Sequence, residues 1–207
     1  MKTKVLSLIL LLAGIVPAAL AQQPDLEQQF ARELKEKCSG LNSIQCRFTQ
    51  TRSAAVLAHD AEKEGSYYFL QPYQVLLAFD DGDYIKITST MFEIRQNGHT
   101  NSTKVGSNPM LKNLNRMLTA CISGDAAQIV SGFRCAITAD EREYRLELLP
   151  QQGRSAKKGP VVRLTFDRSD MSLKQMKMEE PSGDFLQYRF YDVTYNAAVD
   201  PSLFDIR

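Results

Sequence analysis

The sequence predicts an α+β fold in which one long antiparallel sheet is accompanied by a few helices. About ten segments of strand-like alternation follow one another through links of hairpin length, which favours an antiparallel meander over a parallel sheet. Helical periodicity occurs near the N-terminus and in the middle of the chain. A sheet of that length tends to curl, so we expect one concave face.

Residues 1–21 have the composition of a secretory signal peptide. Lys2 and Lys4 precede the apolar stretch 5–16, which is too short to span a bilayer, and Ala19-Leu20-Ala21 matches an A-x-A cleavage site. A short membrane anchor is the alternative reading. We expect export across the inner membrane and one mature domain over residues 22–207. Because position 22 is Gln rather than Cys, we expect a soluble periplasmic protein without a lipid anchor.

Two regions are expected to be helical. Residues 25–38 carry an apolar stripe that ends near Gly40. In the middle, Asn108-Pro109 is a helix-start signal and Ser123-Gly124 a stop signal, with a short second helix expected over 125–130. The helices could fill the concave face as an ordinary core, or cover its mouth and leave an apolar cavity.

The expected strands share alternating apolar residues and are separated by turn residues such as Asp81-Gly82 and Ser182-Gly183. They are 46–51, 65–70, 74–79, 84–88, 91–95, 133–138, 143–149, 160–168, 173–179 and 185–195.

Four cysteines occur in the chain, and an even number in an exported protein is compatible with disulfides. Their spacing favours the local pairs Cys38–Cys46 and Cys121–Cys135, while four buried free thiols remain the alternative. No C-x-x-C motif is present, which removes support for a thioredoxin or paired zinc-ligand motif.

The sequence contains few features that would indicate catalysis, metal or cofactor binding, or nucleic-acid binding. Its two histidines, His59 and His99, lie in polar turns without metal-ligand spacing, and the G-x-S-x-G, H-E-x-x-H and P-loop motifs do not occur. The formal net charge is +1 and the basic cluster 154–158 sits in a loop, so a nucleic-acid partner is not indicated. We therefore expect no enzyme and no cofactor.

Several short motifs, in their order along the chain, resemble the LolA-type family of periplasmic outer-membrane lipoprotein carriers. Residues 44–51 (IQCRFTQT) are similar to the family's F-x-Q segment, and Gly65 followed by Pro72 is similar to its second strand and turn. The closing segment 199–206 (VDPSLFDI) is similar to the family's end with its late Phe.

This resemblance implies an unclosed β-barrel with a helical lid whose concave face shelters the acyl chains of lipoproteins. It implies a monomer that takes acylated lipoproteins or lipids from an inner-membrane releasing complex and delivers them to an outer-membrane acceptor. It also implies a lid latch at position 71, where well-studied members have Arg and this chain has Gln71. A neutral amide cannot make charge-assisted hydrogen bonds, so we expect a weaker latch or one built from other residues.

Strand alternation and the resemblance together give the residues expected to line such a cavity. They are Phe48, Tyr67, Phe69, Gln71, Val75, Leu77, Phe79, Ile85, Phe92, Leu111, Leu114, Met117, Leu118, Met176 and Met178. Core packing is the alternative role for each of them.

The expected function is a periplasmic carrier that shelters lipoprotein acyl chains between the inner and outer membranes. The alternative is a periplasmic lipid-binding sensor or regulatory module with a similar half-barrel. A third possibility is a hydrolase whose site is not visible as a motif.

Overall fold

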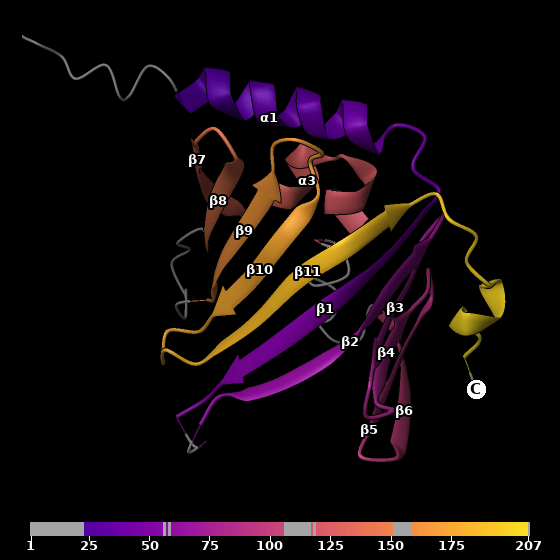
Figure 1. Cartoon of the computed structure of the whole chain (residues 1–207). Helices are drawn as coiled ribbons and strands as arrows, with labels where there is room; N and C mark the ends of the chain where they lie inside the picture. The colour runs from indigo at the N-terminus through magenta and orange to yellow at the C-terminus, as the bar shows by residue number, and fades with distance from the viewer. Residues whose placement is uncertain are drawn as a thin grey trace, which may run out of the picture.

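The computed structural model describes residues 23–55, 57, 59–105, 117, 119–150 and 159–206. Two helices, a C-terminal 3-10 helix and eleven strands have defined bounds (Figure 1). The helices are α1 (Gln23–Cys38), α3 (Ala126–Val130) and η3 (Pro201–Phe204). The strands are β1 (Ser43–Ser53), β2 (Ala61–Leu70), β3 (Gln74–Phe79), β4 (Tyr84–Ile87), β5 (Met91–Gln96), β6 (His99–Lys104), β7 (Phe133–Ala139), β8 (Glu143–Pro150), β9 (Val161–Asp167), β10 (Leu173–Glu179) and β11 (Phe185–Tyr195).

All eleven strands form one antiparallel sheet in the order β6-β5-β4-β3-β2-β1-β11-β10-β9-β8-β7. Each half is a plain meander, and the first and last strands pair at the centre, where Phe48 lies opposite Phe190. β6 and β7 are the two edges, so the sheet is not closed. The predicted α+β class with a long antiparallel meander is confirmed.

β6 is the strand that the sequence did not predict. Its residues, HTNSTK, are polar and nearly all exposed, so they lack the alternation that marks a half-buried strand. Its position follows from the turn before it, where Asn97 and Gly98 both adopt positive φ. That turn brings β6 back along β5.

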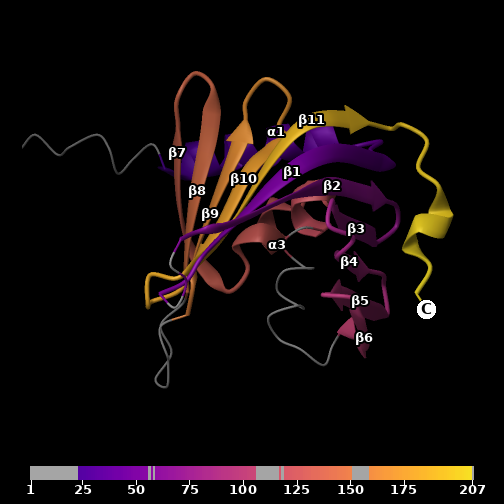
Figure 2. The ribbon, with the colours of Figure 1, turned by 60° about the horizontal axis from the view of Figure 1, so that its bottom comes forward.

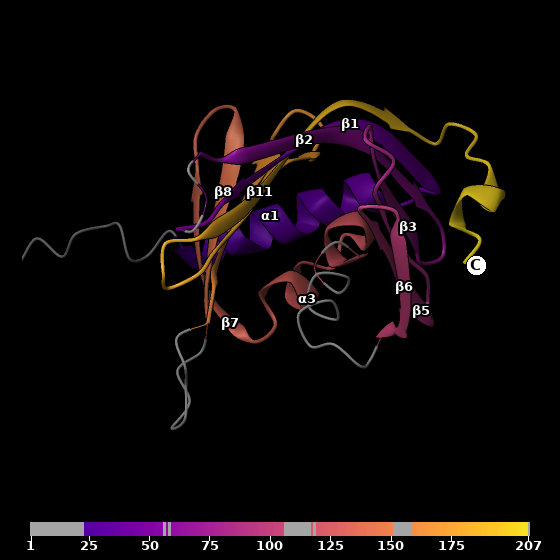
Figure 3. The same cartoon turned by 90° about the horizontal axis from the view of Figure 1, so that it is seen from below.

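The sheet curves around the helices, which lie on its concave side (Figures 2 and 3). α1 crosses β8 and β9, where the Phe30 ring meets the rings of Tyr144 and Phe166 edge-on at centroid distances of 5.3 and 5.1 Å. The hydroxyl of Tyr144 donates a hydrogen bond of 2.8 Å to the Glu33 carboxylate. An apolar contact and a polar contact therefore hold α1 in place.

Residues 119–123 are helical and pack against the end of α1. Gly124, which follows them, has φ of +71°, and a Cβ there would lie 2.8 Å from the Cα of Lys35 and 3.0 Å from the Cβ of Cys38. Glycine thus allows both the left-handed turn and the close approach. This contact sets the distance between the two helical segments at one end of the concave face.

Most of the concave face is filled by the protein's own side chains. The largest side chains below 2% exposure include Phe48, Phe92, Tyr144, Phe166 and Tyr188. On the outer face η3 covers β3 through Phe204, which is 2% exposed. Among the described residues no helix is long and apolar enough to cross a membrane.

Candidate functional site

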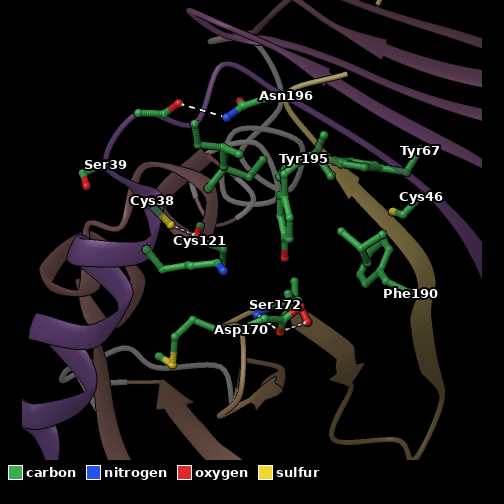
Figure 4. A pocket seen from close by; sticks show the side chains of 18 residues that line it. Cys38, Ser39, Cys46, Tyr67, Cys121, Asp170, Ser172, Phe190, Tyr195 and Asn196 are labelled. Atoms are coloured by element: carbon green, nitrogen blue, oxygen red, sulfur yellow. Dashed lines mark hydrogen bonds between the residues drawn. The ribbon is translucent and has the colours of Figure 1, made fainter. Parts of the chain in front are cut away.

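A hollow of about 300 Å³ lies between the helices and the concave face, at the C-terminal end of α1. Its volume is at the lower end of the range for small-molecule sites. Its lining combines α1 and the residues after it, strands β1, β2 and β11, residues 121–122 and the turn between β9 and β10 (Figure 4). The residues are Lys37, Cys38, Ser39, Gly40, Leu41, Ile44, Cys46, Tyr67, Cys121, Ile122, Asp170, Met171, Ser172, Leu173, Phe190, Val193, Tyr195 and Asn196. We call this hollow the α1 pocket.

The sheet side of the α1 pocket is formed by Cys46, Tyr67 and Phe190. Cys46 and Tyr67 are direct partners across β1 and β2, so their side chains share a face of the sheet. The rings of Tyr67 and Phe190 meet at a centroid distance of 5.8 Å. This wall is apolar apart from one phenol hydroxyl and one thiol.

The helix side of the α1 pocket is formed by Cys38, Cys121 and Ile122. The Sγ of Cys38 donates a hydrogen bond to the carbonyl oxygen of Cys121 over 3.6 Å, although 83 positions separate them in the sequence. Figure 4 shows these two cysteines facing Cys46, Tyr67 and Phe190 across the pocket. The pocket is therefore bounded by helix and sheet on opposite sides.

Polar groups also line the pocket, with Asn196 and the pair Asp170 and Ser172 at opposite ends of it (Figure 4). The carboxylate of Asp170 accepts hydrogen bonds from the backbone N–H and the hydroxyl of Ser172, at 2.9 and 2.6 Å. The Asn196 side chain accepts from the Asn42 backbone N–H at 2.7 Å and fixes the chain after β11 to the chain after α1. Lys37 lies 5.6 Å from the centre of the Tyr195 ring and is the one cation among the lining residues.

The thiols around the α1 pocket are uncharged at neutral pH. Burial raises the pKa of Cys38 to about 11 and that of Cys46 to about 12, and burial also raises the pKa of Cys121. A protonated, buried thiol is a weak nucleophile and a weak metal ligand. Among the described residues no group of His, Cys, Asp and Glu has the arrangement of a metal site.

All four cysteines are free in the structure, so the local pairs favoured by their spacing are not formed. Cys38 hydrogen-bonds to the Cys121 carbonyl rather than pairing with Cys46. Cys135 lies on β7 beside Glu27 and Ala126, in a separate groove. Tertiary packing brings Cys38, Cys46 and Cys121 to one pocket and leaves Cys135 outside it, which nearest-neighbour spacing could not reveal.

Tyr67 carries the one buried side-chain polar atom without a hydrogen-bond partner in the part of the chain that the structure describes. The side chain is 4% exposed. Burial raises the pKa of its phenol well above the ordinary value of 10.0, and the thiols of Cys46 and Cys121 raise it further. The hydroxyl is therefore protonated and able to donate. A buried donor without an acceptor is costly, which makes this atom a marker of an unfilled contact.

The residues that the sequence placed in a cavity have three locations. Tyr67 lines the α1 pocket. Others belong to the filled core: Phe48, Phe69, Val75, Leu77, Phe92, Met117 and Met176 are buried, and Phe79, Ile85 and Met178 are partly buried against them. Leu111, Leu114 and Leu118 lie outside the described residues.

Gln71 occupies a different position from the one that the resemblance implied. It is exposed in the turn between β2 and β3 and is not part of the α1 pocket. Its side-chain amide donates to the Leu41 carbonyl at 2.5 Å, and its backbone N–H donates to the Asn42 carbonyl at 2.9 Å. The residue thus connects the turn to the segment after α1, because the strand has already ended at Leu70.

The sequence reading missed the lining residues of β11. Phe190, Val193 and Tyr195 all reach the α1 pocket, at spacings of three and two residues. The break in alternation falls at Asp192, which has a φ of 54°. An irregularity of this kind moves later side chains to the other face and is not visible in simple period-two counting.

A second depression of about 740 Å³ lies on the outer face of β7 to β11. It is lined by charged side chains, including Arg163, which pairs with Glu147 at 2.9 Å and Glu179 at 3.1 Å. Exposed ion pairs of this kind are solvated. The α1 pocket is the better candidate for an apolar ligand.

An open antiparallel sheet that curves around helices and retains a largely apolar pocket defines an unclosed half-barrel fold. The family model described as outer membrane lipoprotein carrier protein LolA matches residues 39–207, and the chain belongs to that family. The resemblance noted in the sequence is thereby confirmed. No curated protein matches the sequence.

Several solved structures are similar to this chain. A chain of the Pseudomonas aeruginosa MucA/MucB complex is 13% identical, with a TM-score of 0.50 over 87% of this chain and 61% of that chain. A LolA superfamily protein from Nitrosomonas europaea is 12% identical, with a TM-score of 0.44 over 87% and 97%. Lipoprotein LppX from Mycobacterium tuberculosis is 12% identical, with a TM-score of 0.42 over 86% and 98%. At these identities the similarity concerns the fold alone.

Proposed function

We propose that this protein binds acyl chains in the α1 pocket and carries acylated lipoproteins between the inner and outer membranes. One observation supports the proposal most directly. A hollow of about 300 Å³ stays open between helix and sheet at the C-terminal end of α1, with apolar side chains on both walls. Membership of the LolA family makes lipoprotein transfer the function that best fits this hollow.

The size of the pocket sets what it can shelter. If a methylene takes roughly the volume of a water molecule, about 30 Å³, the pocket holds about ten such groups. Each buried methylene contributes about 0.8 kcal/mol, so one such chain segment gains about 8 kcal/mol before the cost of association. The α1 pocket therefore suits one acyl chain segment rather than several complete chains.

The proposed location is the periplasm, reached through the signal peptide at residues 1–21, which lies outside the described residues. N-terminal sequencing of the protein recovered from the cell envelope tests this point. A mature chain that begins at Gln22 supports export and cleavage, whereas a chain that keeps Lys2 and Lys4 contradicts it. The proposed partners are an inner-membrane releasing complex and an outer-membrane acceptor.

Mass spectrometry of molecules that co-purify with the protein from the envelope tests the carrier function. Intact acylated lipoproteins are the expected finding. Acylated lipids alone, with an unmodified partner protein in place of lipoproteins, would favour the sensor or regulatory module. Consistent absence of any acylated molecule would contradict both.

A pocket-filling variant links the ligand to the α1 pocket. Ile122 lines the pocket and is partly buried, so Ile122→Phe should fill part of the hollow and weaken binding of a fluorescent fatty-acyl probe by about tenfold or more. Leu203→Phe is a matched control, because Leu203 lies in η3 on the outer face. Equal probe affinity in both variants would place the ligand elsewhere.

A further inference from the structure

The α1 pocket combines an apolar lining with one buried hydroxyl that has no partner. Tyr67 is 4% exposed, lines the pocket, and its Oη makes no hydrogen bond in the described structure. Tyr195 lines the same pocket but is only partly buried. Tyr188, also buried, accepts a hydrogen bond of 2.6 Å from the Gln50 amide. Tyr67 and Tyr188 are both buried, and of these two described tyrosines Tyr67 is the one whose hydroxyl lacks a partner.

The surroundings of the Tyr67 hydroxyl restrict which acceptor could satisfy it. Cys46 and Cys121 are the titratable groups that act on the Tyr67 pKa, and both thiols are protonated because burial raises their pKa. The one lining cation, Lys37, lies beside the Tyr195 ring. A carboxylate at Tyr67 would therefore be buried without a counter-charge, which is far more costly than burying a neutral carbonyl that receives a hydrogen bond.

We propose that Tyr67 is a specificity-determining residue that donates a hydrogen bond to the ester or amide carbonyl of a single acyl chain bound in the α1 pocket. The inference rests on the proposed acyl-binding function and adds a polar requirement to it. An apolar chain gains from the lining alone, whereas an acyl chain also satisfies the orphaned hydroxyl. The pocket thus distinguishes acyl from alkyl groups of the same length.

A paired set of ligands and variants tests this interaction. The ligands are 1-decanoylglycerol and its ether analogue 1-O-decylglycerol, which share the glycerol group and chain length but differ in the carbonyl. Calorimetry or displacement of a fluorescent probe gives the affinity of each ligand for the mature protein, for Tyr67→Phe and for Tyr188→Phe. Tyr188 lies outside the lining of the α1 pocket and serves as the matched control.

The wild-type protein should bind the ester more tightly than the ether. Tyr67→Phe should weaken binding of the ester about 3- to 10-fold, as expected for one neutral hydrogen bond, and leave binding of the ether unchanged or slightly tighter. Tyr188→Phe should preserve the ester preference. An N-decanoylated peptide, which presents an amide carbonyl, distinguishes the sources: tighter binding than decanoylglycerol points to acylated proteins, and weaker binding points to free lipids.

Three results would overturn the proposal. If Tyr67→Phe weakens ester and ether equally, or affects neither, the hydroxyl is satisfied by water or serves packing only, while the acyl-binding function still stands. If the ester preference persists in Tyr67→Phe, another donor recognises the carbonyl. If neither ligand binds the wild-type protein, both this inference and the proposed function fail.

Discussion

The Sγ of Cys38 donates a hydrogen bond to the carbonyl oxygen of Cys121 and so connects the end of α1 to helical residues 119–123. Both residues line the α1 pocket, with their side chains opposite Cys46 and Tyr67 (Figure 4). The wall on the helix side is therefore held by packing and a weak sulfur hydrogen bond rather than by a covalent link.

Alkaline pH should destabilise the protein through this buried thiol. Burial raises the pKa of Cys38 from 9.0 to about 11. As the pH rises above 9.0, the unfolded chain loses its thiol proton while the folded chain keeps it, so stability is fully present below pH 9.0 and declines as pH approaches about 11. In Cys38→Ala the free energy of unfolding should decline less with rising pH. The difference from the wild type should reach up to about 2–3 kcal/mol near pH 11.

Urea unfolding at several pH values below and within that window measures the difference. Cys135→Ala is a second test at a cysteine outside the α1 pocket: burial raises its pKa to about 11 as well, so this variant should also show a smaller decline. Ligand-free stability curves of wild type and Cys38→Ala that run parallel with pH would contradict the prediction.

Gly65→Ala should destabilise the sheet next to its centre. A Cβ at position 65 would clash with the Ala78 carbonyl oxygen and lie 2.7 Å from Cζ of Phe48. Overpacking of this kind costs about 1–3 kcal/mol. Chemical denaturation of Gly65→Ala, Phe48→Leu and the double variant measures the coupling. The double variant should lose less stability than the summed losses of the two single variants, because the smaller Leu relieves part of the clash. Strictly additive losses would argue against this contact.

Tyr144→Phe should loosen the attachment of α1. The hydroxyl of Tyr144 donates to the Glu33 carboxylate at 2.8 Å, and the residue is 0% exposed. Loss of a hydrogen bond to a charged group should lower the free energy of unfolding by about 1–2 kcal/mol. Tyr68→Phe is the control, because Tyr68 is only partly buried and the described structure gives its hydroxyl no partner. Equal loss of stability in both variants would contradict a specific role of the Glu33 contact.

Gln71→Ala should have a small effect on stability and none on the affinity for an acyl probe. The residue is exposed, contributes one side-chain hydrogen bond to the Leu41 carbonyl, and lies outside the α1 pocket. We expect a loss below about 1 kcal/mol. The resemblance still predicts that Gln71→Arg slows exchange of a fluorescent fatty-acid probe. Stopped-flow displacement tests both variants, and unchanged exchange in Gln71→Arg would show that the position is not a latch.

The meander was predictable because hairpin-length links and period-two alternation are local properties of the sequence. β6 escaped prediction because a polar edge strand buries little, so its place depends on the turn at Asn97-Gly98 and pairing with β5 rather than on apolar alternation. Tyr67 was predicted to face inward and does line the pocket. Phe48 and Phe92 share that inward orientation but complete the core. Alternation identifies the face of a strand, but not whether neighbouring side chains fill the space above it.

The sequence by itself determined the long antiparallel sheet, the N-terminal helix and the family, because these depend on residue order and local periodicity. Only the tertiary structure decided where the sheet and helices leave a hollow and which thiols meet there. The approach of Gly124 to α1, the irregularity at Asp192 and the hydrogen bond between Cys38 and Cys121 together shape the α1 pocket. Each depends on residues far apart in the chain or on a local break in regular geometry. The open pocket and the unpartnered hydroxyl of Tyr67 therefore emerge only when all the elements pack together.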